Sequence, residues 1–182
     1  MRKNLKSKMQ FLPLPVLILG TYDKDGKPNA MNAAWGGIMD YNQVYVSLSK
    51  HKTTENIEAT KAFTISFATK KTAKISDYFG NVSGNSEDKI KKSGVHITKS
   101  EFVNAPIIEE YPLTLECTVD SFEDGILIGT VKNVSIDENY LTADGKIDVD
   151  KMEIISFDMT SNCYRVLGEK VENAFSIKAS DL

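Results

Sequence analysis

The sequence predicts a mainly β domain with a few helices, whose simplest arrangement is an antiparallel barrel. About seven segments are short, apolar and rich in β-branched residues, or alternate polar and apolar with period two, as strands do. Several are joined by turns that suit hairpins. Two or three short helical segments are grouped in the middle of the chain and do not alternate with the strands. A barrel is favoured because closure removes exposed strand edges.

The first half of the chain supplies four of these strands and one helix. Asp25-Gly26 has hairpin chemistry and joins the first two strands. Thr53 and Thr54 are candidate N-caps for a helix that contains Ile57. The predicted strands cover residues 16–21, 29–34, 44–49 and 63–68.

The second half begins with a helical pattern between residues 69 and 94, which Gly94 ends as a C-cap. Glu123-Asp124-Gly125 is the clearest hairpin turn in the sequence. Gly129 lies inside the next strand, where a glycine marks a bulge or the close approach of another group. The remaining predicted strands cover residues 113–119, 126–131, 154–157 and 164–166.

The composition is that of one folded domain. The chain has 182 residues, 41% of them hydrophobic and 26% charged, and this length can bury a core without disulfides or a structural metal. We expect a single domain over residues 1–182, with its core at about 12–167 and a C-terminal tail at about 168–182. The formal net charge of −3 has the wrong sign for a general nucleic-acid binder, so no nucleic-acid partner is expected.

The N-terminus superficially resembles a signal peptide, because basic residues precede an apolar run at 11–20. Pro13 and Pro15 interrupt that run, which is far shorter than the roughly 20 residues of a membrane span. Cys117 and Cys163 lack the dense spacing of a secreted disulfide scaffold. We therefore expect a cytoplasmic protein with no membrane association, with Cys117 as a buried apolar side chain and the role of Cys163 open.

The sequence lacks the residues that several kinds of chemistry require. The glycines complete neither a dinucleotide fingerprint nor a phosphate loop. His51 and His96 lie far from each other and from both cysteines, so no metal site is predicted. Ser83 misses the spacing of a hydrolase nucleophile by one residue. No catalytic residue can be named from these patterns.

The strongest positive signal is at residues 47–54, where a strand ends in hydroxyls and cations immediately before a helix. A helix N-terminus offers free N–H groups and a positive dipole end, and hydroxyls and lysines bind phosphate oxygens. This stretch is either an anion cradle or simply a helix cap with solvated lysines, and spacing alone does not decide between them.

Two further stretches are candidate ligand sites. Residues 29–37 end a strand in small residues, the single tryptophan and two glycines, which lets a backbone approach a flat ligand. The alternative interpretation is a turn covered by a core tryptophan. A loop that enters a helix at Ser83-Gly84 and Asp88-Lys89 can hold another part of an anionic ligand. Lys89 has two alternatives, as a partner of Ser86 or as a solvated side chain.

Together these stretches resemble the flavin reductase-like proteins with an FMN-binding split barrel, and within them the flavoredoxin branch. The resemblance runs from about residue 15 to 164 and depends on the order and spacing of its landmarks. They are Pro15 to Thr21, Asp25 to Asn29, Asn32 to Gly37, Ser47 to Ile57, Ser83-Gly84 with Asp88-Lys89, Ala105-Pro106, and Leu115 to Cys117.

The resemblance implies an antiparallel split barrel that works as a homodimer and binds FMN non-covalently near the subunit interface. Different groups of residues would contact the isoalloxazine ring, its edge and ribityl chain, and the phosphate. Those along the ring would be Asn32, Ala33, Ala34 and Trp35; those at the edge and ribityl chain Ser47, Leu48 and Ser49; those at the phosphate Lys52, Thr53, Thr54 and Asn56; and those closing over the nucleotide Ser83, Gly84 and Lys89. Tyr164 would face either the barrel or the flavin pocket.

The implied activity is that of an FMN-dependent oxidoreductase. It would be a flavin reductase using NADH or NADPH, or a flavoredoxin-like carrier with a small-molecule or protein redox partner. No motif in the sequence indicates a binding site for a nicotinamide nucleotide, so the electron donor is not predicted. Two alternatives remain: a non-catalytic split-barrel module that binds flavin or another ligand, and a barrel holding another planar cofactor such as haem or a deazaflavin. His51 has two interpretations, as a participant near the polar edge of the ring or as a solvated loop residue, and the second is expected.

Overall fold

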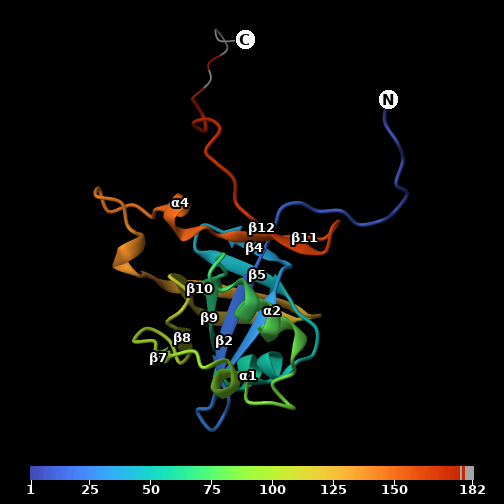
Figure 1. The fold of residues 1–182 in the computed structure, drawn as a ribbon. Helices are drawn as coiled ribbons and strands as arrows, with labels where there is room; N and C mark the ends of the chain where they lie inside the picture. The colour runs from blue at the N-terminus through green and yellow to red at the C-terminus, as the bar shows by residue number, and fades with distance from the viewer. Residues whose placement is uncertain (177, 179–182) are drawn as a thin grey trace.

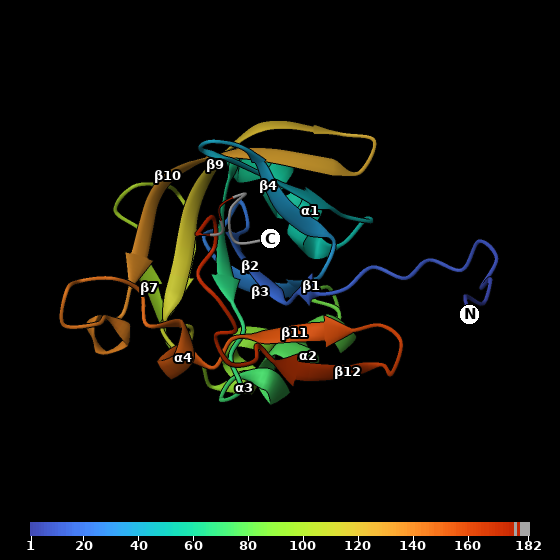
Figure 2. The same ribbon diagram turned by 90° about the horizontal axis from the view of Figure 1, so that it is seen from above.

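A computed structural model of the chain, which describes residues 1–176 and 178, confirms a mainly β protein with a curled antiparallel sheet (Figure 1). Seven strands form this sheet, which curls into a half-barrel (Figure 2). In spatial order they are β3 (Pro28–Ala33), β2 (Leu17–Tyr22), β6 (Ala62–Phe67), β9 (Leu113–Glu123), β10 (Ile126–Ile136), β5 (Gln43–Ser47) and β4 (Gly36–Asp40).

Smaller elements complete the fold around this sheet. Two short antiparallel sheets contain β1 (Leu14–Pro15), β11 (Ile155–Asp158) and β12 (Cys163–Val166), and β7 (Ile97–Lys99) and β8 (Pro106–Ile108). The helices are α1 (Lys52–Thr60), α2 (Ala73–Asn81), α3 (Lys89–Ser93), α4 (Val149–Met152) and the 3₁₀ helix η1 (Glu138–Tyr140).

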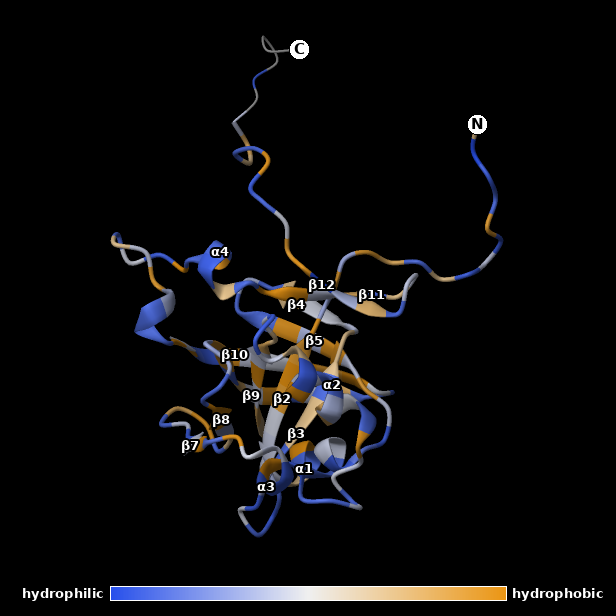
Figure 3. Ribbon diagram, viewed as in Figure 1, coloured by the Kyte–Doolittle hydropathy of each residue, from blue (hydrophilic) through white to orange (hydrophobic). Residues whose placement is uncertain are grey.

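The hydrophobic core lies on both faces of the sheet, so that β2 and β3 contribute to two clusters. Leu19, Met31 and Phe63 belong to the cluster inside the curl, to which α1 adds Ile57. Ala30 belongs to the cluster on the other face, where α2 and α3 pack. Figure 3 shows hydrophobic residues concentrated along the strands of the curled sheet, whereas most connecting loops are hydrophilic.

The hairpin predicted at Glu123-Asp124-Gly125 joins β9 and β10. Asp124 and Gly125 both adopt positive φ, at 50° and 80°, which matches the twist of the flanking strands. Ile126 pairs with Glu123 directly after the turn. The prediction is confirmed because the turn residues alone determine this local geometry.

Gly129 is both a bulge and a close approach, as the sequence suggests. The register between β10 and β9 shifts between Ile128 and Gly129. A Cβ added at Gly129 would lie 2.6 Å from the ring of Phe63 and 2.8 Å from the carbonyl oxygen of Thr118. The buried Phe63 ring therefore occupies the space that a side chain would need.

The start of α1 differs from the prediction, because His51 is its N-cap and the helix begins at Lys52. Thr54 lies in the first turn, where its Oγ1 accepts a hydrogen bond from the His51 N–H at 3.0 Å and donates one to the His51 carbonyl at 2.8 Å. A hydroxyl at the third residue of a helix stabilises the first turn as an N-cap hydroxyl does. The sequence pattern alone therefore did not determine at which residue the helix begins.

The two ends of the chain leave the body above β11 and β12 (Figure 1). Residues 168–176, in the predicted tail, contain no helix or strand; the rest of that tail apart from Lys178 lies outside the described residues. Within the described part of the chain, none of the helices has the length and apolar character needed to cross a lipid bilayer.

Substituting Gly129→Ala is expected to destabilise the fold by about 1–3 kcal/mol, because the new methyl group must displace Phe63 or the β9 backbone. Urea unfolding followed by circular dichroism measures the difference. Gly168→Ala is the control, because no atom of another described residue lies within 4 Å of a Cβ built there. Equal stability of the two variants would contradict the close packing of Phe63 against Gly129.

Candidate functional site

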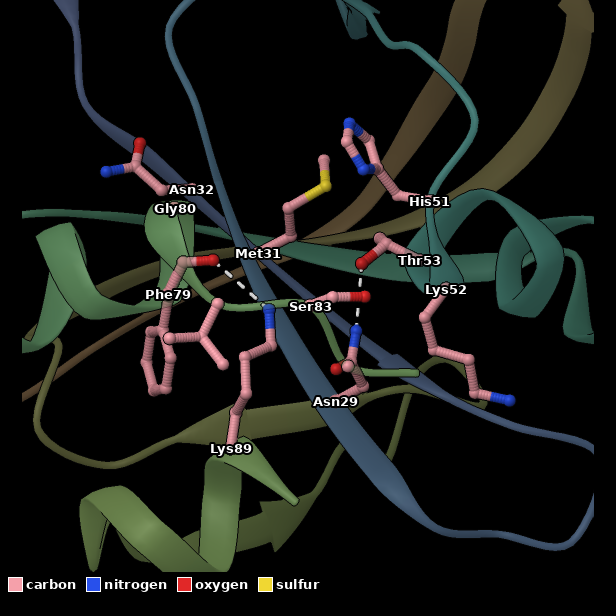
Figure 4. A pocket seen from close by; sticks show the side chains of 12 residues that line it. Asn29, Met31, Asn32, His51, Lys52, Thr53, Phe79, Gly80, Ser83 and Lys89 are labelled. Atoms are coloured by element: carbon pink, nitrogen blue, oxygen red, sulfur yellow. Dashed lines mark hydrogen bonds between the residues drawn. The ribbon is translucent and has the colours of Figure 1, made fainter. Parts of the chain in front are cut away.

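Two adjoining chambers lie beside β3, between the start of α1 and the segment from α2 to α3. The inner chamber has a volume of about 70 Å³, and its lining is drawn in Figure 4: Asn29, Met31, Asn32, His51, Lys52, Thr53, Phe79, Gly80, Val82, Ser83, Gly84 and Lys89. The outer chamber, of about 240 Å³, is lined by Asp23, Lys27, Pro28, Asn29, Lys52, Gly84, Asn85, Glu87, Asp88 and Lys89. Four residues line both and form their junction: Asn29, Lys52, Gly84 and Lys89.

The position of β3 explains why a cavity forms here. β3 is an edge strand of the seven-stranded sheet, so within the described part of the chain one of its sides has no neighbouring strand. Met31 belongs to the core on one face of the sheet, whereas Asn32 follows it in the strand and points to the other face. Both line the inner chamber, so this chamber crosses the free edge of β3, where unpaired peptide groups are available to a ligand.

The N-terminus of α1 forms one wall of the inner chamber. Thr53 is buried, and its Oγ1 accepts a hydrogen bond of 2.9 Å from Asn29 Nδ2 (Figure 4). Lys52 is partly exposed, and its Nζ lies 3.8 Å from a carboxylate oxygen of Asp23. The first residues of a helix present N–H groups without intrahelical partners, so this wall is suited to an anion.

Lys89 brings a buried positive charge to the opposite wall. It is 4% exposed, and its Nζ donates a hydrogen bond of 3.1 Å to the carbonyl oxygen of Phe79 near the end of α2 (Figure 4). Burial lowers the pKa of Lys89 to about 8. In residues 1–176 and 178, no ion pair joins Lys89 to a carboxylate, so a bound anion would stabilise its charged form.

The two alternatives for Lys89 are therefore wrong. Lys89 is neither solvated nor bonded to Ser86, whose Oγ donates to the carbonyl of Ser83. Lys89 is the first residue of α3 and Asp88 its N-cap, and the short helix directs the lysine inward. The sequence pattern showed the helix start but not which neighbours surround it.

The structure brings together one group of the predicted site residues at the chambers. They are Asn32, Lys52, Thr53, Ser83, Gly84 and Lys89. Ser83 lies in the exposed loop after α2. A Cβ at Gly84, in the same loop, would lie 2.3 Å from Asn29 Oδ1, so only glycine lets this loop approach β3 so closely. Asn32 is anchored through a 2.9 Å hydrogen bond from Nδ2 to the carbonyl of Ser76 in α2.

Other predicted site residues lie elsewhere. Leu48, Ser49 and Thr54 line a separate cavity of about 380 Å³ between α1 and the β9–β10 hairpin. Trp35 is 62% exposed and lines an apolar cavity with Phe11 of the N-terminal segment, so it is not a core tryptophan.

The remaining predicted residues are held in structural contacts. Ala33 pairs with Leu17 and packs on the core inside the curl, and Ala34 is half-buried in the connection to β4. The N–H of Ser47 donates to the carbonyl of Trp35 at 2.7 Å. Asn56 is buried and donates to Thr21 Oγ1 at 3.0 Å.

Tyr164 lies beside the helices that form the chamber walls. Its hydroxyl donates a 2.9 Å hydrogen bond to Asp77 of α2, and its ring packs against Phe157. Burial, together with Asp77, raises the pKa of Tyr164 to about 12. Its hydroxyl therefore stays protonated and ties β12 to α2.

Six residues of the inner chamber were not among the predicted site residues: Asn29, Met31, His51, Phe79, Gly80 and Val82. His51 is exposed but caps α1 and lines the inner chamber, so it is more than a solvated loop residue. Asn29, Met31 and His51 lie in the stretches 29–37 and 47–54, which the sequence marks as candidate ligand sites, although these three residues were not themselves assigned to the site. Phe79 to Val82 carry no motif, because they reach the chamber through the packing of α2 on β3.

The two thiols differ in environment. Cys117 is buried in β9, where burial raises the pKa of its thiol to about 12, in agreement with its expected role as a buried apolar side chain. Cys163 is half-buried in β12, immediately before Tyr164.

Comparison with known proteins agrees with this architecture. Residues 9–148 match the family described as flavin reductase like domain. The flavoredoxin of Desulfovibrio vulgaris (Miyazaki F) is 36% identical over 97% of this chain and 98% of that chain, with a TM-score of 0.93. The flavoredoxin from Methanosarcina acetivorans is 28% identical over the whole of both chains, with a TM-score of 0.89.

A more distant structure shares the fold alone. Nitrilotriacetate monooxygenase component B from Bacillus cereus is 19% identical over 95% of this chain and 98% of that chain, with a TM-score of 0.78. Among proteins of curated function, no significant match was found.

In the flavin-free protein, the Lys89→Met substitution should show how much the buried charge of Lys89 lowers the free energy of unfolding. Because the folded-state pKa of Lys89 is about 8 and its ordinary value is 10.5, the folded state binds fewer protons than the unfolded state between these pH values. The free energy of unfolding of Lys89→Met should therefore exceed that of the wild type by on the order of 2 kcal/mol at pH 7, and this difference should shrink as the pH rises to 10.

Chemical denaturation at a series of pH values measures this difference. Lys91→Met is the control, because Lys91 is an exposed lysine of the same helix. A difference between Lys89→Met and wild type that does not change with pH would contradict the burial of a charged Lys89.

Proposed function

Because the chain belongs to the flavin reductase-like family, in its flavoredoxin branch, we propose that it is an FMN-binding oxidoreductase. It passes electrons from a nicotinamide cofactor or a protein donor, through FMN, to a small-molecule or protein acceptor. The observation that carries this proposal is the junction of the two chambers, where a buried lysine, which has no carboxylate partner among the described residues, faces the N-terminus of a nine-residue helix.

The junction has the donors that a phosphate group requires. The unpaired N–H groups at the start of α1, the hydroxyl of Thr53 and the ammonium group of Lys89 converge on a space of the right polarity. Lys52 adds a second cation at the rim. In this proposal Thr54 and Asn56 act indirectly, since the hydrogen bonds of their side chains hold α1 in position.

The free edge of β3 is suited to the flavin ring. Met31 and Phe79 offer apolar contact, and Asn32 and the unpaired peptide groups of the edge can meet the polar rim of a flat heterocycle. The inner chamber of about 70 Å³ is too small to enclose a tricyclic ring, so the ring extends along residues 33–35 towards Trp35. The small side chains of Ala33 and Ala34 leave room for it.

When bound, FMN supplies the reversible hydride and electron transfer. The chain holds the phosphate, orients the ring across β3 and keeps water from one of its faces. Cationic and N–H groups near the ring favour its anionic reduced form. Since the cofactor performs the redox step, the chain needs no catalytic dyad of its own.

We also propose that the protein is a homodimer. β4 is the other edge strand of the sheet, and its region exposes large apolar side chains that include Trp35, Ile38, Met39 and Tyr41; Ile38 is 83% exposed. An exposed apolar face of this kind on an edge strand is typical of a protein interface. A second copy on this face would lie beside Trp35 and cover the part of the ring that one chain leaves open.

Ile38→Glu tests the dimer. Placing a carboxylate in the apolar face should shift the protein from dimer to monomer in sedimentation velocity experiments and weaken flavin binding, since burying a charge without a partner is costly. Val134→Glu is the matched control, because Val134 is an exposed β-branched residue of the same sheet. A wild-type protein that sediments as a monomer would exclude the dimer.

The function itself is tested by identifying and reconstituting the flavin. We expect the purified protein to show flavin absorption and to release FMN on denaturation, or to bind added FMN. Lys89→Met should weaken FMN binding by about tenfold or more while leaving riboflavin binding unchanged, because riboflavin has no phosphate. Lys91→Met should behave as the wild type.

The outcomes separate the remaining activities. Oxidation of NADH or NADPH by the loaded protein indicates a flavin reductase, whereas reduction by a protein donor alone indicates an electron carrier. Bound FMN that no donor reduces would favour a non-catalytic binding module. Failure to bind riboflavin, FMN or FAD would overturn the proposal.

A further inference from the structure

We infer that residues 83–88, which connect α2 to α3, form a lid over the junction of the two chambers, and that the ion pair between Lys27 and Asp88 is the latch of this lid. The lid has to open before an anion can reach Lys89 and Thr53. The part of the inference that concerns flavin rests on the proposed function, whereas the lid itself does not require a flavin.

The groups suited to a phosphate are closed off from solvent. Lys89 is 4% exposed and Thr53 is 1% exposed, although both line the inner chamber. Water therefore has almost no access to these side chains, and a phosphate group is larger than a water molecule. An anion can reach them only if part of the chamber wall moves.

Gly84 brings the lid onto the junction. A Cβ built at Gly84 would lie 2.3 Å from Asn29 Oδ1 and 3.3 Å from Lys52 Cβ, and all three residues line both chambers. The side chain of Asn29 is held in place, because its Nδ2 donates a hydrogen bond to Thr53 Oγ1. The backbone of the lid thus packs directly against the residues that join the chambers, so movement of the lid widens this passage.

The backbone hydrogen bonds of the lid allow it to move as a unit. In the part of the chain that the structure describes, these bonds stay within the lid or run to α3: the N–H groups of Ser86 and Glu87 donate to the carbonyl of Ser83, and the carbonyl of Asp88 accepts from Lys92. The lid residues are exposed or half-buried. A segment with so few bonds to the body opens at a lower free energy than the elements of the core.

Side-chain contacts hold the lid closed. Lys27, in the turn between β2 and β3, lies 3.0 Å from Asp88 and so ties the lid to the sheet. Glu87 accepts a hydrogen bond of 3.1 Å from the Tyr78 hydroxyl of α2 and lies 3.3 Å from Lys92 of α3. The side chains of Lys27 and Asp88 are 57% and 34% exposed, so the latch is weak and sensitive to salt.

The rate at which Lys89 is acylated in the flavin-free protein measures the opening of the lid. An amine-reactive acetylating reagent reaches Lys89 only when the lid is open, whereas Lys91 is exposed in the same helix and provides an internal reference. Peptide mass spectrometry after short labelling times gives both rates. We expect Lys89 to react at least about tenfold more slowly than Lys91 in the wild type.

Two variants destabilise the closed lid. Lys27→Met removes the latch and should raise the rate of Lys89 acylation by about two- to fivefold at low salt, with a smaller effect at high salt. Gly84→Ala places a methyl group against Asn29 Oδ1 and should raise this rate by about tenfold or more. Lys24→Met is the matched control, because Lys24 is an exposed lysine of the same turn and has no ion pair among the described residues.

The same variants test whether the lid limits flavin exchange. Stopped-flow measurements should show that FMN both binds and dissociates faster in Lys27→Met than in the wild type, because a latch must open for entry and for release. The dissociation constant should change little. Lys24→Met should show the wild-type rates. Unchanged FMN rates in a variant whose Lys89 is acylated faster would overturn the link between the lid and flavin exchange.

Two results would overturn the lid itself: acylation of Lys89 as fast as that of Lys91 in the wild type, or a Lys89 rate that the folded variants do not change. Circular dichroism establishes folding, and Lys27→Met decides the question by itself if Gly84→Ala does not fold. A protein whose Lys89 is acylated as expected but that binds no flavin would retain the lid and overturn the proposed function instead.

Discussion

The site depends on one buried charge. Lys89 places an ammonium group where β3, α2 and α3 meet, with the carbonyl of Phe79 as its hydrogen-bond acceptor. Burying a charge with a single neutral partner is unfavourable, which is why its pKa is lowered. The core around it, formed by Ala30, Phe79 and Ile90, must therefore supply the stability that the lysine costs. A bound anion is the group that would turn this unfavourable position into a favourable one.

The second constraint is the free edge of β3. An unpaired edge strand is normally covered or charged, because its peptide groups would otherwise pair with another chain. Here α1 packs on one side of β3 and α2 and α3 on the other, and the inner chamber opens between them. The unpaired peptide groups of this edge, which must be kept from pairing with another chain, thus also form a surface for a flat polar ligand. The opposite edge, β4, carries exposed apolar residues, and among the described elements it packs mainly against its neighbouring strand β5.

Local signals predicted the fold well because each depends on a few neighbouring residues. The Asp124-Gly125 turn, the Gly94 C-cap and the bulge at Gly129 all follow from positive φ or the absence of a Cβ. The observed start of α1 differs from the predicted one, because a hydroxyl can stabilise a helix N-terminus either as the N-cap or from the first turn. The strands and hairpin turns already favoured an antiparallel barrel, and the family resemblance specified that this barrel is split.

The site was predictable in part for the same reason. The sequence by itself determined the hairpin turn at Asp124-Gly125, the Gly94 C-cap and the polar loop at Ser83-Gly84, since these depend on local backbone chemistry. The tertiary structure alone decided that Lys89 is buried, that Asn29 and Phe79 join the same chamber, and that Leu48 and Ser49 line a different one. Those facts depend on which segments pack against β3, and the contacts between segments far apart in the chain leave no local pattern in the sequence.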